Sequence, residues 1–438
     1  MRARPLAYSL RAPVDQALDK LIADGIITAV ETSDWATPIV PVVKTDGTIR
    51  ICGDYKLTLN KCLEVDRFPL PRVEDLLVKL NGGVKFTKID LSQAYAQFPL
   101  SEASKKYTVI NTHRGLFQYN RLIYGLSSSP GIFQRKLEEM FADLPQVGVF
   151  LDDVILTGVN DKKHLETLHT VLDRLSKFGL KVEKKKCNFF VNSVTYLGYM
   201  IDKEGIHTNR EKVEAIQRVP LPTTVSAVRA FIGMVMYYGK FIKNISTILS
   251  PLYALLKKGA KFLWSSECDT AFVTVKNKLM SSEVLVHYNP ELPLILTTDA
   301  SNVGIGAVIS HEMPDGRERP IAFASRVLNT AERAYSQIDK EALSIIYGVK
   351  KFHQYLFGRK FILRTDHKPL VTIFGPKRGI PTMAASRLQR WAVILAAYRY
   401  DIEHVTTFRN GADALSRLPS GGQLREEAES RGYICQFH

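Results

Sequence analysis

Two adjacent aspartates, Asp152 and Asp153, interrupt a segment that is otherwise apolar. The segment 147–157 (VGVFLDDVILT) is apolar on both sides of the pair, which predicts two β-strands bent around an acidic turn. One aspartate in a tight turn is common, because its side chain binds nearby backbone groups. Two adjacent carboxylates repel each other, and a hard divalent cation such as Mg²⁺ relieves that repulsion. The pair therefore predicts either a metal site or an acidic turn.

Asp90 offers a third carboxylate at the end of a predicted strand, 84–90. The chain between Asp90 and Asp152 is long enough to return Asp90 beside the acidic turn in one sheet. Three carboxylates can hold two metal ions about 3.5–4 Å apart, as in polymerases and nucleases. The alternative is an acidic turn with an unrelated aspartate.

Composition limits the class of protein. The 438 residues suit two to four domains, and 45% hydrophobic residues exclude a disordered chain. The net charge of +15 favours a polyanionic partner such as nucleic acid, although a merely basic soluble protein has the same property. The chain has no apolar run of about 18 residues and no signal core, which predicts an intracellular protein without a membrane span. Its cysteines form no CxxC pair and are expected to be free thiols; they are Cys52, Cys62, Cys187, Cys268 and Cys435.

Periodicity divides the chain into three structured parts. Up to about residue 210, it predicts helices at 13–30, 131–142 and 162–178, and strands at 37–52 (a hairpin turning at Asp46-Gly47), 84–90, 147–157 and 194–201. From 211 to 280 it predicts helices at 223–243, 247–258 and 267–280. Basic and aromatic residues are mixed on these helices, which suits either gripping a nucleic-acid backbone or plain helix packing. Beyond 290 it predicts strands at 292–299, 304–310, 319–324, 360–366 and 399–405, and helices at 331–356 and 384–397. The predicted domains are 1–210, 211–285 and 286–418, followed by a tail at 419–438.

A second set of carboxylates lies in the third part. Asp299 and Asp366 end predicted strands, where aspartate is disfavoured. Glu341 comes three residues after Ile338 and four before Ile345, so it faces the apolar side of its helix. A buried carboxylate needs a partner, which is either a metal ion or a basic side chain. Asp413 could belong to the same set or cap a short helix.

Five segments resemble, in order, the motifs of reverse transcriptases. They are IRICGDY (49–55), KIDLSQAY (88–95), YGLSSSPGIFQ (124–134), FLDDV (150–154) and YLG (196–198). The four later carboxylates match the ribonuclease H domain of the same family. The chain resembles the Ty3/gypsy type of long-terminal-repeat retrotransposon from about residue 4 to 418.

The resemblance implies an α/β (α+β) fold, a right-hand polymerase of fingers, palm and thumb followed by an RNase H-like mixed sheet. It implies two Mg²⁺ ions, or alternatively Mn²⁺, at each active site. One site would be held by Asp90, Asp152 and Asp153 and the other by Asp299, Glu341, Asp366 and Asp413.

Roles near the nucleotide are also implied by the resemblance. Lys44 and Arg50 would face the triphosphate, and Tyr95 would exclude a 2′-hydroxyl by bulk. Gln134 would touch the template. Tyr124 stands beside the nucleotide where relatives more often have Phe or Gln. Phe150 replaces the tyrosine of retroviral relatives, and no histidine is assigned to the nuclease site; His367 is expected in a supporting or surface position.

The implied function is RNA-directed DNA synthesis with hydrolysis of the RNA in RNA–DNA hybrids. The partners would be an RNA template, a DNA primer, the hybrid and dNTPs, with no membrane. The chain would be part of a polyprotein with protease and integrase, in a cytoplasmic particle or in the nucleus. Three alternatives stay open: a non-catalytic nucleic-acid-binding remnant, a nuclease with a structural polymerase-like half, and a polymerase that copies DNA.

Overall fold

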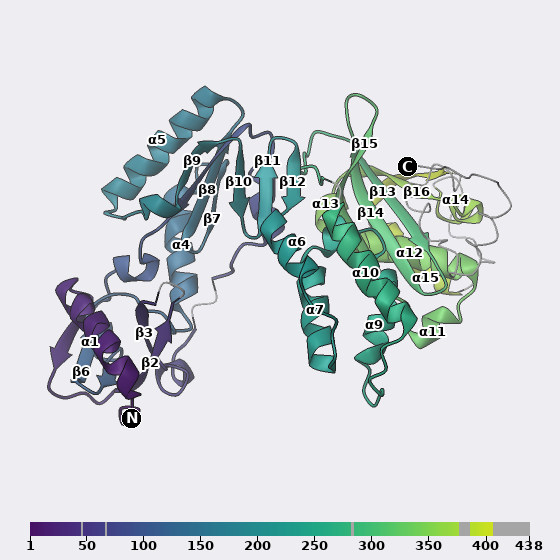
Figure 1. Cartoon of the computed structure of the whole chain (residues 1–438). Coiled ribbons are helices and arrows are strands. Elements are labelled where there is room, and N and C mark those ends of the chain that lie inside the picture. Colours follow the sequence, from purple (N-terminus) through teal and green to yellow (C-terminus); the bar gives the residue numbers. More distant parts are fainter. Residues whose placement is uncertain (45–46, 66–67, 282–283, 376–385, 406–438) are drawn as a thin grey trace, which may run out of the picture. The chain divides into compact units, whose positions relative to one another are not determined.

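The structure is a computed structural model that describes residues 1–44, 47–65, 68–281, 284–375 and 386–405 (Figure 1). It divides into two compact units, Met1–Leu197 and Gly198–His438. Both units mix helices and strands, which confirms the predicted fold class. No helix in the described ranges is long and apolar enough to cross a membrane.

The first unit contains two sheets. A five-stranded sheet has the order β1-β6-β5-β2-β3, and a four-stranded sheet has the order β7-β8-β4-β9. The five-stranded sheet consists of β1 (Ile27–Val30), β2 (Thr37–Val43), β3 (Ile49–Gly53), β5 (Ile110–Thr112) and β6 (Gly115–Tyr119). The four-stranded sheet consists of β4 (Lys85–Asp90), β7 (Val147–Phe150), β8 (Asp153–Gly158) and β9 (Asn188–Val191). A further strand, β10 (Ser193–Tyr196), follows them.

Helices cover these sheets and bury their apolar faces. They are α1 (Tyr8–Ala23), α2 (Val73–Val78), α3 (Glu102–Lys105), α4 (Ser129–Phe141) and α5 (Asp161–Lys177), with 3-10 turns η1 (Leu59–Lys61), η2 (Ala94–Gln97) and η3 (Lys184–Lys186). Helix α4 contacts β7, and α5 contacts β8 and β4. Their core includes Ile89, Phe133 and Val171, each fully buried. This packing fixes the strand ends that carry Asp90 and Asp153.

The second unit begins with a hairpin and a group of helices. These are β11 (Tyr199–Asp202), β12 (Gly205–Thr208), α6 (Arg210–Gln217), α7 (Val225–Tyr237), η4 (Gly239–Phe241), α8 (Ile245–Ile248), α9 (Ser250–Leu255) and α10 (Ser266–Met280). A five-stranded sheet follows, in the order β15-β14-β13-β16-β17. Its strands are β13 (Leu294–Ala300), β14 (Gly304–Glu312), β15 (Glu318–Val327), β16 (Lys360–Thr365) and β17 (Arg399–His404). Strands β13, β14 and β15 pair antiparallel, whereas β16 pairs parallel with both β13 and β17.

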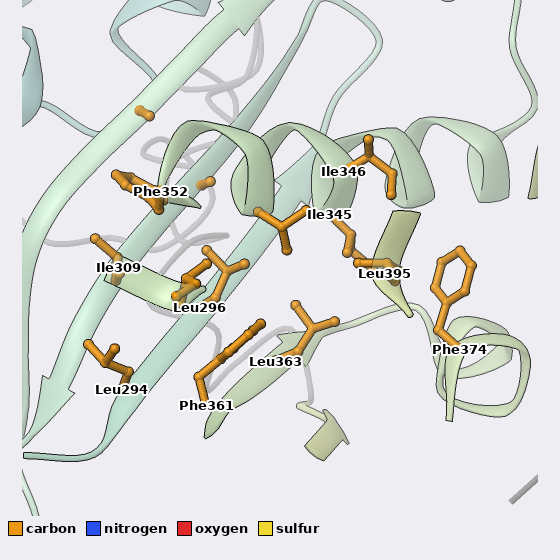
Figure 2. Close-up of a cluster of buried hydrophobic side chains, with 14 of the residues drawn as sticks. Leu294, Leu296, Ile309, Ile345, Ile346, Phe352, Phe361, Leu363, Phe374 and Leu395 are labelled. Carbon is orange, nitrogen blue, oxygen red and sulfur yellow. The ribbon is translucent and has the colours of Figure 1, made fainter. Parts of the chain in front are cut away.

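One long helix, α12 (Gln337–Lys351), packs against β13 and β14 of this sheet. Figure 2 shows the core cluster here, which includes Ile345 and Ile346 of the helix and Leu296 and Leu363 of the strands. The other helices of the sheet region are α11 (Thr330–Arg333), α13 (His353–Leu356), α14 (Lys368–Phe374) and α15 (Ser386–Leu395). The N-terminal turns of α12, which contain Glu341, lie at the C-terminal end of β13, where Asp299 is located.

Several predicted boundaries are wrong. The helix predicted over 13–30, with a stop near Gly25, begins earlier, at Tyr8, and ends at Ala23; Gly25 has a φ of +65°, as the predicted stop requires, whereas Ile27–Val30 is a strand paired with β6. The predicted strand 194–201 is two strands, separated by Leu197 and Gly198, which both have positive φ. The predicted helices 331–356 and 247–258 are each divided, the first into α11, α12 and α13 and the second into α8 and α9. Strands β1, β5 and β6 and helix α14 were missed by periodicity because they are short.

Other predictions are confirmed. The hairpin over 37–52 forms as β2 and β3, with Gly47 at a φ of +79° in the turn and Asp46 outside the described residues. Cys52, Cys62, Cys187 and Cys268 are free thiols, and Cys435 lies outside the described residues.

Candidate functional sites

The acidic pair lies on a tight turn that a buried glutamine holds. Phe150 pairs with Asp153 across β7 and β8, so Leu151 and Asp152 form the turn, and Leu151 has a φ of +51°. Gln134 of α4 donates from Nε2 to the Val149 carbonyl at 2.8 Å, and its Oε1 accepts from the Leu151 amide at 2.7 Å. A left-handed leucine is disfavoured, so these two bonds stabilise the turn that presents Asp152.

The expected template contact of Gln134 is therefore wrong. Its side chain is 0% exposed, and Nε2 also donates to Glu138 Oε1 at 2.7 Å. Because both ends of the buried amide are engaged within the protein, the side chain cannot reach a template strand. Gln134 instead positions the acidic turn.

Asp90 lies directly opposite Asp153 in the ladder of β4 and β8. Residues opposite each other on antiparallel strands have Cβ atoms about 4.5–5.5 Å apart. Just beyond this pair, the Leu91 amide donates to the Asp152 carbonyl at 3.0 Å. The three carboxylates predicted from sequence to converge thus lie at one end of the four-stranded sheet.

Two lysines balance the charge of this cluster. Lys88 Nζ lies 3.1 Å from Asp153 Oδ1, and Lys186 Nζ lies 3.5 Å from Asp90 Oδ1. Burial raises the pKa of Asp153, Lys88 opposes that rise, and the charges of Asp152 and Asp90 add to it. In the described part of the chain, no three His, Cys, Asp or Glu side chains are spaced as metal ligands. The donor set is nevertheless the one that a hard divalent cation takes, because all three side chains are carboxylates, and two of them, Asp90 and Asp153, lie beside lysine ammonium groups.

A cleft of about 790 Å³ joins this acidic end to the β2–β3 hairpin. Asp90 and Asp152 line it from one side, and Lys44, Arg50 and Tyr124 line it as well. The cleft thus brings together the carboxylates and the basic residues expected to face a triphosphate.

Aromatic rings pack against one another beside the carboxylates. The Arg50 guanidinium lies 4.6 Å from the centre of the Tyr124 ring, and the Tyr95 ring lies 4.7 Å from the Tyr124 ring. Tyr95 also packs edge-on against Phe133 at 5.2 Å. Burial, with smaller contributions from Tyr124 and Asp152, raises the pKa of Tyr95 to about 12. Tyr95 is thus a neutral, supported ring close to Asp152.

A second acidic site lies on the sheet of the second unit. Ile295 pairs with Ile362 and Leu296 with Leu363 in the parallel ladder of β13 and β16. Continued along both strands, that register places Asp366 at the level of Asp299. Asp299 is 6% exposed. Two aspartates therefore end adjacent central strands side by side.

Glu341 faces these aspartates from α12. It is 4% exposed, as its place on the apolar face predicts. Burial and then the charges of Asp366 and Asp299 raise its pKa to about 9. Gln337 Nε2 donates to Glu341 Oε1 at 2.6 Å, whereas the buried Oε2 has no hydrogen-bond partner among the described residues. A buried carboxylate oxygen without a partner fits a missing cation better than a salt bridge to a basic side chain.

Asp413 was predicted for this site, and two histidines, His404 and His367, lie near it in the sequence. Asp413 lies outside the described residues. His404 Nε2 lies 3.1 Å from the Asp366 carbonyl, which makes it a backbone contact near the site. His367, expected in a supporting or surface position, occupies the N-cap position of α14 without a side-chain capping hydrogen bond and is partly buried.

Sequence reasoning missed three polar neighbours of the carboxylates. Lys88 precedes Asp90 by two residues on β4, so the two share a face of the strand, a signal that was available. Gln337 precedes Glu341 by four residues on α12, an equally available helical signal. Lys186 is remote in sequence, and periodicity gives no signal for it.

Comparison with known families identifies two domain types. Residues 42–201 match the family "Reverse transcriptase (RNA-dependent DNA polymerase)". Residues 264–363 match the family "RNase H-like domain found in reverse transcriptase".

Curated relatives match nearly the whole chain. The Retrovirus-related Pol polyproteins from transposon 297 and transposon 412 of Drosophila melanogaster are 33% and 31% identical over 94% and 92% of this chain. The Transposon Tf2-3 polyprotein of Schizosaccharomyces pombe (strain 972 / ATCC 24843) is 30% identical over 95% of it. The chain spans only 39%, 33% and 31% of the lengths of these three relatives.

Solved structures show the same fold. A foamy viral protease-reverse transcriptase in complex with dsDNA superposes with a TM-score of 0.83 at 24% identity, over 93% of this chain and 85% of that one. The same type of protein in complex with an RNA/DNA hybrid gives 0.77 at 23% identity, over 96% of this chain and 57% of that one.

The chain contains a reverse transcriptase domain and, after it, an RNase H-like domain. It is homologous over most of its length to Pol polyproteins of the Ty3/gypsy type.

Proposed function

We propose that this chain synthesises DNA on an RNA template and hydrolyses the RNA strand of the resulting hybrid. The observation that carries the polymerase half is the placement of Asp90 opposite Asp153, with Asp152 on the adjoining turn and in one cleft with Arg50. The reaction would join a primer 3′-hydroxyl to the α-phosphate of a dNTP and release pyrophosphate.

Asp90, Asp152 and Asp153 would hold Mg²⁺ at the polymerase site. Bound there, the ions would neutralise phosphate charge and lower the pKa of the attacking hydroxyl. Mn²⁺ has the same preference for oxygen ligands and is the alternative ion.

The other residues of the cleft would bind and orient the nucleotide. Arg50, held over the Tyr124 ring, would present its planar fork to phosphate oxygens, and Lys44 would add a second positive charge. Tyr95, packed against Tyr124 and Phe133, would exclude a 2′-hydroxyl by its bulk.

The nuclease half rests on the environment of Glu341. Its buried, unpartnered Oε2 lies in the field of Asp299 and Asp366. These three residues, with Asp413, would hold Mg²⁺ and direct water at an RNA phosphodiester. The 2′-hydroxyl and the duplex shape would distinguish the RNA strand.

The proposed partners are an RNA template, a DNA primer, dNTPs and the RNA–DNA hybrid. The net charge of +15 and the foamy viral structures with dsDNA and with an RNA/DNA hybrid support them. The homologous Pol polyproteins support a place in a larger polyprotein, with protease and integrase as expected neighbours.

Extension of a labelled primer on matched RNA and DNA templates tests the polymerase half. Wild type should extend on RNA with Mg²⁺, and Asp152→Asn should not. Extension on DNA alone would favour a DNA-copying polymerase. Binding of the hybrid without any extension by wild type would favour a non-catalytic binding protein. Hybrid cleavage by wild type without extension would favour a nuclease with a structural polymerase-like half.

A further inference from the structure

The segment 243–248, which lies before the RNase H-like sheet in the chain, docks on that sheet beside Asp299. Ser246 is buried, its amide donates to Ser325 Oγ at 3.0 Å, and its hydroxyl donates to the Ser325 carbonyl at 2.8 Å. Gly306 pairs with Asp299 on one side and with Ser325 on the other. The docked segment therefore covers the strand next to Asp299.

Two glycines of β14 make room for this contact. A Cβ on Gly306 would lie 2.1 Å from Asn244 Oδ1, and a Cβ on Gly304 would lie 2.6 Å from Thr247 Oγ1. Neither glycine has a positive φ, so the backbone conformation does not require glycine at these positions. The space taken by the docked segment does require it.

A small polar cavity remains between the docked segment, helix α10 and the end of β13. Its volume is about 70 Å³, far below the roughly 300–1,000 Å³ of pockets that hold whole small molecules. The cavity has room for a few waters or one oxyanion, because a single water needs about 10–15 Å³ on this measure. Its polar lining comes from Lys243, Asn244, Thr247, Thr274, Lys278, Asp299 and Ser301.

The lining has the chemistry of a phosphate site. Two ammonium groups outweigh the single carboxylate, and amide and hydroxyl groups add hydrogen-bond donors. Lys243 and Lys278 are partly exposed, whereas Asp299 and the two glycines are buried. The lysines thus stand at the rim and Asp299 at the floor, so a bound nucleic-acid strand could reach them.

We propose that Lys243 and Lys278 bind a phosphodiester of the RNA strand beside Asp299. The docked segment 243–248 then forms part of the nuclease site. Lys243 and Lys278 determine which phosphodiester bond of the RNA strand lies at the carboxylates. This inference rests on the proposed nuclease function. The lysines are positioning residues, since they contact the strand next to the reacting phosphate.

The test uses the full chain and an RNA–DNA hybrid. Lys243→Met and Lys278→Met remove the charge and keep the length of the side chain, and Lys243→Arg and Lys278→Arg keep the charge. Lys351→Met is the matched control, because Lys351 is exposed, lies outside the helical part 211–280 and lines none of these cavities. Hybrid affinity is measured in EDTA at several salt concentrations, and cut positions are mapped with Mg²⁺. Thermal unfolding identifies variants that fold.

Each methionine variant should bind hybrid roughly tenfold more weakly than wild type. A plot of the logarithm of its affinity against the logarithm of the salt concentration should have a slope smaller in magnitude by about 1, as expected when one phosphate contact is lost. Its cuts should spread over neighbouring bonds, whereas the arginine variants and Lys351→Met should behave as wild type.

Folded Lys243→Met and Lys278→Met variants with the affinity, salt dependence and cut positions of Lys351→Met would overturn the inference. If the methionine variants do not fold, the arginine variants decide. Folded arginine variants whose cut positions differ from those of wild type would contradict the inference. A wild type that binds hybrid but never cuts it would overturn the nuclease function itself, and the affinity comparison in EDTA would still decide whether the lysines bind a phosphate.

Discussion

The buried amide of Gln134 accepts a hydrogen bond from the backbone of Leu151, which takes a left-handed conformation next to Asp152. The same amide donates to the Val149 carbonyl, so one side chain bonds both sides of the turn. The geometry of the acidic turn therefore depends on a residue that is itself 0% exposed.

Replacing Gln134 with leucine should disturb the turn without greatly changing the volume of the side chain. The substitution leaves the Val149 carbonyl and the Leu151 amide without this partner, and each unmet buried group costs about 1–3 kcal/mol. We expect the free energy of unfolding to fall by about 2–4 kcal/mol and primer extension to fall by roughly 10- to 100-fold. Denaturant unfolding and single-turnover extension measure the two effects.

Glu139→Gln is the control for this prediction, because Glu139 is exposed on the same helix. It should retain both properties. Extension by Gln134→Leu within twofold of wild type would show that the turn does not need the amide.

Glu341 should make the metal-free protein less stable as the pH rises. Its folded pKa of about 9 lies above the ordinary value of 4.5. The protonated form therefore contributes stability that is complete below about pH 4.5 and is lost as the pH rises toward 9. Between pH 4.5 and 7, the loss amounts to about 3 kcal/mol.

Unfolding in EDTA across this pH range, for wild type and Glu341→Gln, measures the effect. The glutamine variant should lack this loss and be the more stable protein at pH 7, and Glu291→Gln, at an exposed position, should follow wild type. Parallel pH curves for wild type and Glu341→Gln would mean that the carboxyl group titrates normally.

Arg50→Lys should weaken nucleotide binding although it keeps the charge. Lysine cannot present a planar fork to phosphate oxygens, and the contact with the Tyr124 ring at 4.6 Å would be weakened. We expect the KM for dNTP to rise roughly tenfold with a smaller change in kcat. Steady-state extension gives both constants, and Lys56→Ala, at an exposed position outside the cleft, is the control. An unchanged KM would place Arg50 outside the nucleotide site.

Tyr95→Val should admit ribonucleotides. The substitution removes a ring held between Tyr124 and Phe133 and opens space near Asp152. The ratio of dNTP to rNTP incorporation should fall at least tenfold, a change of about 1.4 kcal/mol in discrimination. Tyr95→Phe keeps the ring and should keep the ratio. A ratio that changes equally in both variants would mean that the hydroxyl, and not the bulk, makes the selection.

The sequence predicts the parts of these sites that depend on local periodicity. Strand alternation places Asp90 and the acidic turn at strand ends, and helical spacing places Glu341 on the buried face of α12. These patterns are local, so neighbouring residues suffice to predict them. The resemblance to the ordered motifs of reverse transcriptases adds the assignment of each carboxylate to one of the two predicted sites.

Contacts between distant segments are not predicted in this way. Gln134 lies 17 residues from Leu151, and its amide could equally have faced solvent. Residues 27–30 continue a helical pattern, but pairing with β6, far along the chain, makes them a strand. The cavity beside Asp299 depends on two glycines and a segment more than 50 residues earlier, which no periodicity connects.

The central claim is that two separate groups of carboxylates perform two separate reactions. It is tested most directly by running primer extension and hybrid cleavage in parallel on wild type, Asp152→Asn and Glu341→Gln. We predict that Asp152→Asn loses extension and still cuts the hybrid, whereas Glu341→Gln extends the primer and no longer cuts. If either substitution abolishes both activities in a folded protein, or leaves both intact, the assignment of the two sites is contradicted.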